Sequence, residues 1–191
     1  VGDFGGGGMF LAFGLVCGIL EAQKSGKGQV VDAAMIEGSA LLANMFFSFR
    51  STGSWKEERG SNILDGGADF YDTYETKDGK YMAVGAIEPQ FYARLLELTG
   101  SDPDFSKDQL DQSNWPGRKD KLTAIFKTKS RDEWAALMEA EEACSVPVLT
   151  LSESMEHPHI KAREVFVNHE GVDQVAPAPR FSRTEPKLDL P

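Results

Sequence analysis

A single carboxylate precedes a glycine run near the beginning of the chain. Asp3 is followed by Phe4 and four consecutive glycines, Gly5 to Gly8, and Met9 then opens a mostly apolar stretch. Glycines allow positive φ angles and let a ligand approach the backbone closely. A helix that starts after them would present unpaired N–H groups and the positive end of its dipole. The pattern therefore predicts a site for an anion or a developing oxyanion, with Asp3 as proton carrier or nucleophile.

Two other interpretations apply to the same glycine run. A flexible N-terminal tail contains glycines without a function, and these residues alone leave that interpretation equally open. A phosphate-binding Gly-x-Gly-x-x-Gly motif fits less well, because it needs a preceding strand and a surrounding βαβ unit.

Charge and cysteine usage exclude several classes of protein. The 191 residues include 30 acidic and 20 basic side chains, for a net charge of −10, which argues against a general binder of nucleic acid or anionic membranes. Cys17 and Cys144 lie far apart in apolar or helical settings. A disulfide framework or a metal site is therefore not expected, and a reducing cytoplasm fits best.

The longest apolar run, from Met9 to Leu20, is shorter than the roughly 20 residues that a membrane-spanning helix needs. It also lacks the basic start and the cleavage site of a signal peptide. Because the chain begins with Val1 and its most suggestive residue is the third, we expect it to be part of a longer protein.

The sequence of the amino-terminal third predicts a helix, a short strand and a second helix. We predict a helix over 9–24 that is buried on most faces and ends at Gly26. A short strand is expected over 29–33, within which Asp32 is either a second functional carboxylate or the cap of the next helix, over 34–50.

The central part predicts a small α+β unit after a long loop over 51–68. Two β-rich runs, 70–75 and 81–86, flank an Asp-Gly turn and predict a hairpin. Pro89 then starts a helix that Gly100 ends.

The remaining elements complete a ββ–α–α–α–β order. Ser130-Arg131-Asp132-Glu133 has the spacing of a capping box. The expected elements are a polar connection over 101–116, helices over 119–126, after Ser130 and over 158–166, a strand over 146–151 that Pro147 places at an edge, and an extended tail from Val172.

Strings spread through the whole chain resemble those of the α-methylacyl-CoA racemases, in the family III CoA-transferase fold group. They are Asp3-Phe4-Gly5-Gly6-Gly7, Ser25-Gly26-Lys27-Gly28-Gln29-Val30-Val31-Asp32-Ala33, Arg59-Gly60-Ser61-Asn62, Leu64-Asp65-Gly66-Gly67-Ala68, Val84-Gly85-Ala86-Ile87-Glu88-Pro89-Gln90-Phe91-Tyr92 and Ala178-Pro179-Arg180-Phe181-Ser182.

The resemblance implies an α/β fold, namely the carboxy-terminal portion of a family III CoA-transferase-like fold. Residues 1–33 would belong to the Rossmann-like large CoA-binding domain, and 34–69 would form a linker helix and loop. Residues 70–157 would form the small α+β domain, and 158–191 would return to the large domain. Two chains would interlock as a homodimer, with each active site between the two subunits.

The resemblance also assigns site residues. Asp3 matches the catalytic aspartate, and Glu88 matches a glutamate near the catalytic histidine. That histidine precedes the aspartate in the family, and the chain's own histidines, His157, His159 and His169, lie too late in the sequence to replace it. The residues expected to bind CoA are Gly5, Gly6, Gly7, Arg59, Gly60 and Asn62, and the Trp55–Asn62 loop is expected to serve the partner subunit's pocket.

The implied function is racemisation of a 2-methylacyl-CoA thioester by 1,1-proton transfer through an enolate-like intermediate, in lipid metabolism. The substrate is an acyl-CoA thioester, no separate cofactor is needed, and neither nucleic acid nor a membrane is an expected partner. Two alternatives stay open: a family III CoA-transferase with Asp3 as nucleophile, and a non-catalytic structural fragment. The chain alone is expected to be inactive and to expose an apolar surface.

Overall fold

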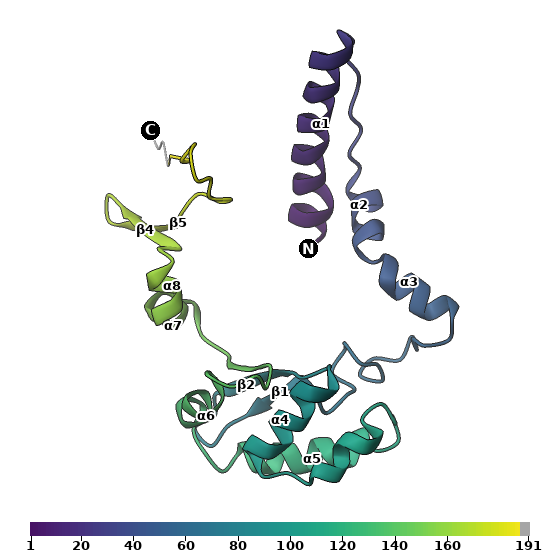
Figure 1. Cartoon of the computed structure of the whole chain (residues 1–191), viewed down its shortest axis with the longest axis vertical. Coiled ribbons are helices and arrows are strands. Elements are labelled where there is room, and N and C mark those ends of the chain that lie inside the picture. The colour runs from purple at the N-terminus through teal and green to yellow at the C-terminus, as the bar shows by residue number, and fades with distance from the viewer. Residues whose placement is uncertain (188–191) are drawn as a thin grey trace. The chain divides into compact units, whose positions relative to one another are not determined.

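The chain forms two units in the computed structural model, which describes residues 1–187. Unit 1 comprises Val1–Gly67 and unit 2 comprises Ala68–Pro191. Figure 1 labels most of their helices and strands. The four-part division expected from the sequence stays a prediction.

Unit 1 begins with a helix that includes the glycine run. A π-helix, η1 (Gly2–Met9), continues directly into α1 (Phe10–Ser25). As predicted, α1 ends at Gly26, whose left-handed φ of 76° suits glycine. The prediction of a glycine loop ahead of the helix is wrong, because the glycines are themselves helical.

Together η1 and α1 form one helix of 24 residues, Gly2–Ser25. This helix is long and apolar enough to cross a membrane, whereas the sequence predicted an apolar run too short to do so. The core helix of a soluble protein passes the same test of length and composition, so the finding is weak evidence for a membrane span.

The segment between α1 and the next helix is extended but is not a strand, contrary to the prediction for 29–33. Val31 packs against α1 beside Gly14 and Gly18, where added Cβ atoms would lie 2.8 and 3.2 Å from its methyl groups. The segment therefore contacts a helix through a side chain, and among the described residues it pairs with no neighbouring strand. Asp32 is exposed and does not cap the next helix, whose N-cap is Ala34.

The helix predicted over 34–50 is two helices. They are α2 (Met35–Leu42) and α3 (Asn44–Ser51), separated at Ala43, where φ is −88° and ψ is 5°. As predicted, the residues after Ser51 form a loop without helix or strand until unit 2 begins.

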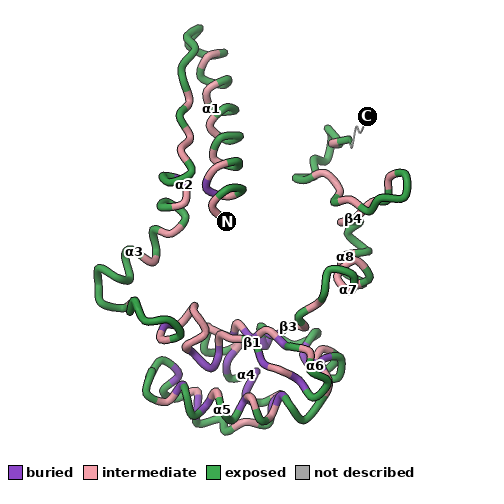
Figure 2. Tube along the Cα trace, turned by 180° about the vertical axis from the view of Figure 1, so that it is seen from behind, coloured by how far each residue is buried: buried purple, intermediate pink, exposed green. Residues whose placement is uncertain are grey.

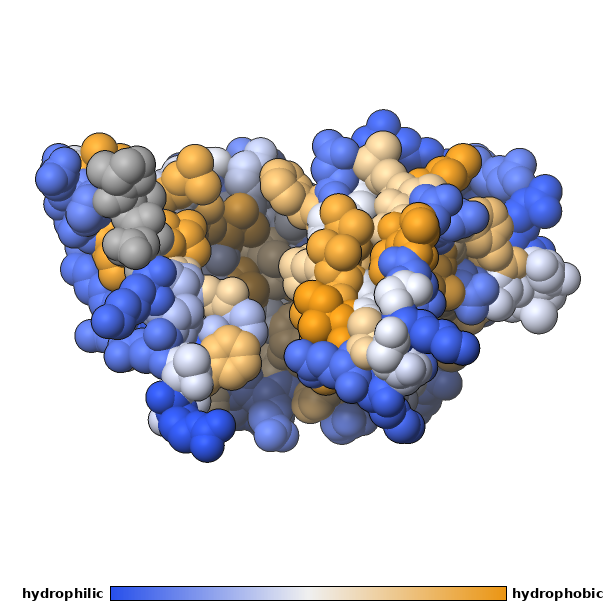
Figure 3. All heavy atoms as spheres, turned by 90° about the horizontal axis from the view of Figure 1, so that it is seen from above, coloured by the Kyte–Doolittle hydropathy of each residue, from blue (hydrophilic) through white to orange (hydrophobic). Residues whose placement is uncertain are grey.

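The amino-terminal helices of unit 1 leave most of their apolar side chains uncovered (Figure 2). No residue of α1 is buried, so the prediction of burial on most faces is wrong for this chain. Figure 3 shows hydrophobic side chains gathered over this part of the surface. Those exposed on α1, α2 and α3 are Leu11, Phe13, Leu15, Val16, Ile19, Leu20, Met35, Ile36, Leu41, Leu42, Met45, Phe47 and Phe49.

Unit 2 is built around a three-stranded antiparallel sheet. The predicted hairpin is confirmed as β1 (Tyr71–Glu75) and β2 (Tyr81–Gly85), in a register that pairs Tyr71 with Gly85. The third strand, β3 (Ser145–Pro147), pairs with β2 and lies at an edge, where Pro147 was expected.

Helices between β2 and β3 cover this sheet and supply the core (Figure 2). They are α4 (Pro89–Thr99), the 3-10 helix η2 (Pro103–Asp108), α5 (Trp115–Phe126) and α6 (Arg131–Met138). The predicted order is confirmed, but η2 was expected as part of a surface connection and α5 begins earlier than 119. Side chains that are almost completely buried include Phe70, Tyr74, Met82, Tyr92, Leu95, Leu122, Phe126 and Trp134.

The carboxy-terminal part of unit 2 differs most from the prediction. It contains α7 (Leu151–Glu156), α8 (Pro158–Ala162) and a hairpin of β4 (Phe166–His169) with β5 (Val172–Val175). The sequence missed α7 and the hairpin, and it extended the helix of α8 too far. Short strands paired only with each other bury little apolar surface, so their hydrophobic alternation is weak.

A cluster of charges joins α6 to α7. Arg131 is 5% exposed, and its guanidinium donates to Glu153 Oε2 and Oε1 at 2.8 and 3.0 Å, while Lys80 Nζ donates to Glu153 Oε1 at 2.8 Å. These hydrogen bonds to two cations lower the pKa of Glu153 well below its usual range. Glu153 also closes a capping box with Thr150 at the start of α7.

The predicted capping box of α6 gives a test of local stability. Ser130 Oγ accepts from the Glu133 N–H, and Glu133 Oε2 accepts from the Ser130 N–H at 2.8 Å. Ser130→Ala leaves a helix-start N–H without its acceptor, so the free energy of unfolding should fall by about 1 kcal/mol. Thermal or urea unfolding measures it. The matched control is Ser152→Ala, at an exposed position within α7, and equal losses in the two variants would contradict the assignment.

Candidate functional site

Asp3 lies in the first turn of η1, and its side chain is exposed to solvent. The N–H groups of Gly5 and Gly6 both donate to the carbonyl oxygen of Val1, at 2.8 and 3.1 Å. These two donors are therefore used inside the helix and are not free to hold an anion. The first N–H groups of a helix have no intrahelical acceptor, so the donors beside Asp3 are those of residues 2–4.

The glycine run serves a close contact with α2. A Cβ on Gly38 would overlap the carbonyl oxygen of Gly6 and lie 2.8 Å from its carbonyl carbon. A Cβ on Gly6 would lie 2.5 Å from Ser39 Oγ and 2.7 Å from Ser39 N. Real Cβ atoms essentially never come within 3.0 Å of other atoms. The two backbones thus meet at a point where neither chain has room for a side chain.

Glu88 is the N-cap residue of α4 in unit 2, directly before Pro89. Its carbonyl oxygen accepts from the N–H groups of Phe91 and Tyr92, each at 3.0 Å, while its side chain makes no capping hydrogen bond. The carboxylate is exposed. It lies near the Cys144 thiol, whose pKa is raised first by burial and then by the negative charges of Glu88 and Glu142. The backbone of Glu88 is thus held in place by hydrogen bonds, while its carboxylate is available to a ligand.

The third group of predicted residues forms a turn closed by a buried amide. Asn62 is 2% exposed, and its side chain accepts from the Lys56 N–H at 2.8 Å and donates to the Lys56 carbonyl at 3.0 Å and to Asp65 Oδ2 at 2.6 Å. Asn62 was predicted to bind CoA. These contacts engage its donors and acceptor within the loop, and its contact with CoA stays a prediction.

Asp65 completes this turn as an acceptor. Its oxygens accept from the N–H groups of Gly60 at 3.1 Å, Asn62 at 2.8 Å and Gly67 at 3.2 Å. Burial opposes ionisation of Asp65, but the hydrogen bonds from Asn62, Gly67 and Ser61 outweigh it and lower the pKa. Gly60 has a left-handed φ of 71°, so glycine suits this corner of the turn.

Arg59 is the exposed cation of the same turn. In the part of the chain that the structure describes, its guanidinium makes no hydrogen bond or ion pair. Arginine presents a planar set of donors that matches phosphate oxygens. Of the predicted residues in this turn, Arg59 is therefore the one whose side chain is available to a ligand.

The structure brings the predicted residues together in three groups. Asp3, Gly5, Gly6 and Gly7 share η1, the loop of unit 1 holds Arg59, Gly60 and Asn62, and Glu88 belongs to unit 2. The three histidines have other positions: His157 caps α8 and lies 3.5 Å from Glu139, His159 is within α8, and His169 ends β4. Within residues 1–187 no group of three or more His, Cys, Asp or Glu side chains could hold a metal ion.

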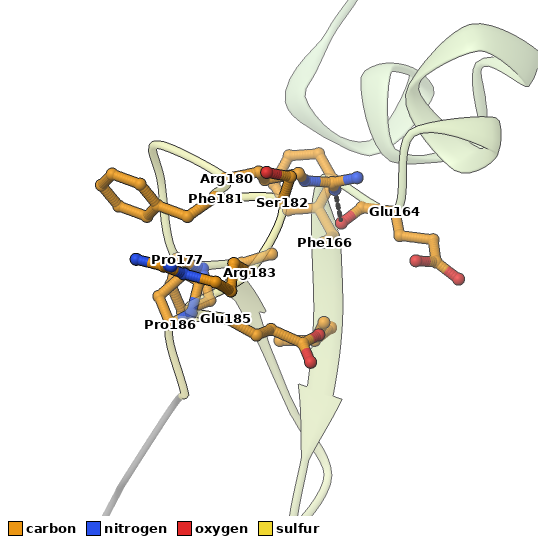
Figure 4. A pocket seen from close by; sticks show the side chains of 11 residues that line it. Glu164, Phe166, Pro177, Arg180, Phe181, Ser182, Arg183, Glu185 and Pro186 are labelled. Atoms are coloured by element: carbon orange, nitrogen blue, oxygen red, sulfur yellow. Dashed lines mark hydrogen bonds between the residues drawn. The ribbon is translucent and has the colours of Figure 1, made fainter.

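A cavity of about 730 Å³ lies in the carboxy-terminal part of unit 2, between the β4–β5 hairpin and the segment after it (Figure 4). Phe166, Phe181 and Arg183 are among its lining residues. Arg180 also lines it, but donates to the carbonyl oxygen of Glu164 at 2.9 Å. No predicted site residue lines this cavity, so it supplies no support for the expected chemistry.

One buried carboxylate was missed by the sequence analysis. Asp69 is fully buried, accepts from the Tyr92 hydroxyl at 2.6 Å through Oδ2, and has no hydrogen-bond partner at Oδ1 among the described residues. Burial raises its pKa, opposed by Tyr92 and by the charges of Arg118 and Lys119. Its backbone oxygen accepts from the Tyr74 hydroxyl at 2.5 Å. The only signal in the sequence was an acid directly between Ala68 and Phe70.

The chain is similar to known proteins over almost its whole length. The sequence model of CoA-transferase family III matches residues 1–191. Proteins named alpha-methylacyl-CoA racemase are 44% identical over 183 residues in Mus musculus and 42% identical over 177 residues in Homo sapiens. A succinyl-CoA–D-citramalate CoA-transferase of Chloroflexus aurantiacus is 29% identical over 164 residues.

The matched regions cover 95%, 93% and 83% of this chain but 48%, 46% and 40% of those relatives. The chain therefore spans about half the length of the curated relatives it matches. Among solved structures, a CAIB/BAIF family protein from Brucella suis has a TM-score of 0.67 at 24% identity, covering 96% of this chain and 50% of that one. A protein from M. tuberculosis has a TM-score of 0.71 at 18% identity, covering 93% and 47%. The predicted fold class is confirmed.

Asp69 generates a prediction about pH. Because burial raises its folded-state pKa above the unfolded value of about 4, this carboxyl supports folding fully below that pH and loses the contribution as pH rises through the folded pKa. The melting temperature of the wild type minus that of Asp69→Asn should therefore be largest near pH 4 and decrease toward pH 8.

Thermal unfolding across this range measures the difference. The exposed Asp120→Asn variant in α5 is the control, and its difference from the wild type should not follow the same trend. A pH-independent difference for Asp69→Asn would contradict the prediction.

Proposed function

The chain belongs to CoA-transferase family III, and we propose from this membership that the protein containing it is an α-methylacyl-CoA racemase. The observation that carries the proposal is the identity of 44% and 42% to two proteins named as such, against 29% to a named CoA-transferase. The reaction is a 1,1-proton transfer at the α-carbon of a 2-methylacyl-CoA thioester.

The exposed start of η1 suits this chemistry. Removal of the α-proton moves negative charge onto the thioester oxygen, and the free N–H groups at a helix start can stabilise it. Loss of one such donor typically costs roughly 3 kcal/mol of transition-state stabilisation. Asp3, in the first turn, is the proton carrier on one face. Gly5 and Gly6 support this turn through their helical hydrogen bonds rather than as anion ligands.

Racemisation needs a second proton carrier on the opposite face of the α-carbon. As the resemblance implies, we propose for it a histidine other than this chain's own three; of these, His157 is engaged at the start of α8 with the His159 N–H and Glu139. Glu88 is the residue that would orient this histidine, since carboxylates commonly fix an imidazole through its N–H. The free carboxylate of Glu88 fits that purpose.

The turn around Asn62 is the proposed CoA contact. Asn62 and Asp65 hold its backbone, so Arg59 is presented on a rigid support to a phosphate of CoA. The protein is proposed to act as a homodimer in which this turn serves the partner subunit. The exposed apolar side chains of α1 to α3 are consistent with a covered surface in that assembly (Figure 3). No separate cofactor is proposed, since CoA is part of the substrate, and the proposed location is the cytoplasm.

Transfer of CoA is the second candidate, because the matching family model is that of CoA-transferase family III. In that reaction a carboxylate oxygen of Asp3 would attack the thioester carbonyl and release the CoA thiolate, forming an aspartyl anhydride. The exposed side chain of Asp3 is compatible with this attack as well as with proton transfer.

Isotope exchange separates the two reactions. The complete protein is incubated with a single enantiomer of a 2-methylacyl-CoA in deuterated water, and mass spectrometry follows the α-position. Racemisation predicts deuterium at the α-carbon together with the opposite enantiomer, and Asp3→Asn should lower both rates at least 10²-fold because it removes one proton carrier. Acyl exchange onto added carboxylates without deuterium uptake would refute racemisation.

Arg59 gives a prediction about binding. Arg59→Ala removes the free cation of the turn and should raise KM for the CoA thioester about 10-fold with little change in kcat, because the phosphate contact is equally present in ground and transition states. Steady-state kinetics measure both constants. Arg183→Ala in unit 2 is the matched control and should leave KM unchanged. A fall in kcat at constant KM would contradict the assignment of Arg59.

A further inference from the structure

The contact between η1 and α2 involves the same turn of η1 that carries Asp3. Four glycines of η1 face α2, namely Gly2, Gly5, Gly6 and Gly7, whose added Cβ atoms would have Ser39, Leu42 or Met35 among their nearest neighbours. Gly2 and Gly6 are four residues apart, so they lie on one face of the helix. Asp3 directly follows the first of these glycines. The position of the Asp3 turn is thus determined by where α2 holds this face.

Gly38 is the residue of α2 with least room. It is buried, and a Cβ there would overlap the backbone of Gly6, which cannot move away as a flexible side chain can. The Gly6 N–H in turn donates a hydrogen bond to the carbonyl oxygen of Val1, at the start of the same turn. Any shift of Gly6 is therefore transmitted to Asp3, three residues earlier.

We propose that Gly38 is a positioning residue for the proposed reaction and that it acts through η1 to hold Asp3 in place. This inference rests on the proposed function of Asp3. Reactions that depend on proton transfer lose rate steeply when the reacting group is displaced by about 1 Å. Binding of CoA, assigned to the turn around Arg59, does not depend on this contact.

For Gly38→Ala, helix propensity alone predicts a more stable helix, whereas the proposed contact predicts a lower kcat. Alanine favours a helix more than glycine does, so a position that only needs helix should become more stable. The close contact predicts that kcat falls about 10²-fold while KM for the CoA thioester changes less than threefold. Substitution of a residue needed only for folding would lower the amount of folded protein. It would not lower the kcat of the folded enzyme while leaving KM nearly unchanged.

The experiment uses the complete protein, with Gly28→Ala as the matched control. A Cβ at Gly28 would meet nothing within 4 Å, so this variant should keep both kcat and KM. If Gly38→Ala does not fold, Ser39→Thr adds one methyl group at the same contact and should show a smaller loss of kcat. Wild-type kinetics for Gly38→Ala, or for Ser39→Thr where it is the variant tested, would overturn the proposal.

A second readout keeps this inference separate from the proposed function. Hydrogen exchange of the Gly5 and Gly6 amides, both bonded to Val1, should accelerate in Gly38→Ala and stay unchanged in Gly28→Ala. If the wild type transfers CoA instead of racemising, the racemase proposal fails, but the same kcat is read on that reaction, since both need Asp3. Unchanged exchange at η1 would overturn the positioning of Asp3 by Gly38, whatever the activity.

Discussion

The close approach of two backbones, at Gly6 of η1 and Gly38 of α2, is the constraint on which unit 1 depends. Glycine disfavours a helix by about 1 kcal/mol per residue relative to alanine, so four glycines in sequence would not become helical on local preference alone. Absence of side chains at this point lets α2 lie against η1, where a Cβ on either glycine would come within 3.0 Å of the other helix. Packing therefore determines the conformation of the segment that carries Asp3.

The other two groups of site residues are held by hydrogen bonds rather than by close packing. In the loop of unit 1, the buried Asn62 amide and the Asp65 carboxylate take up each other's polar groups, so the backbone around Arg59 has little freedom. At the start of α4, the proline after Glu88 and the bonds to its carbonyl oxygen fix the backbone but leave the carboxylate free. In the loop, Asn62 and Asp65 hold the backbone, and the Arg59 side chain is available to a ligand. At the start of α4, Pro89 helps to fix the backbone, and the Glu88 carboxylate is available.

Sequence patterns predicted the elements that local rules determine. The Asp-Gly hairpin, the capping box at Ser130, the proline at the start of α4 and the glycines that end α1 and α4 all follow from the conformation of a few neighbouring residues. The position of Glu88 directly before the helix of Pro89 could be anticipated in the same way, whereas Asp3 was expected in a loop and lies in η1. The assignment of both residues to a reaction came from resemblance to a family.

The sequence-based predictions failed where contacts with residues distant in the sequence determine the local structure. Neither the helical glycine run, which depends on Gly38, nor the extended segment at Val31, which depends on α1, has a local signal that distinguishes it from a loop or a strand. Asn62 was expected to contact CoA because its type and motif suit a ligand contact, and that assignment stays a prediction. Its contacts with Lys56 and Asp65, which engage its polar atoms, have no signal in the sequence. Burial of Asp69 is likewise a property of the assembled core.

The choice between racemase and transferase does not lie in Asp3. An exposed carboxylate at a helix start serves equally as proton carrier and as nucleophile, because both reactions place charge on the same thioester oxygen. What differs is the group on the opposite face of the substrate: racemisation needs a second proton carrier there, and transfer needs room for an incoming acid. In the proposed racemase, Glu88 is the carboxylate assigned to orient that second proton carrier, so the proposal of racemisation depends on the imidazole that Glu88 would hold.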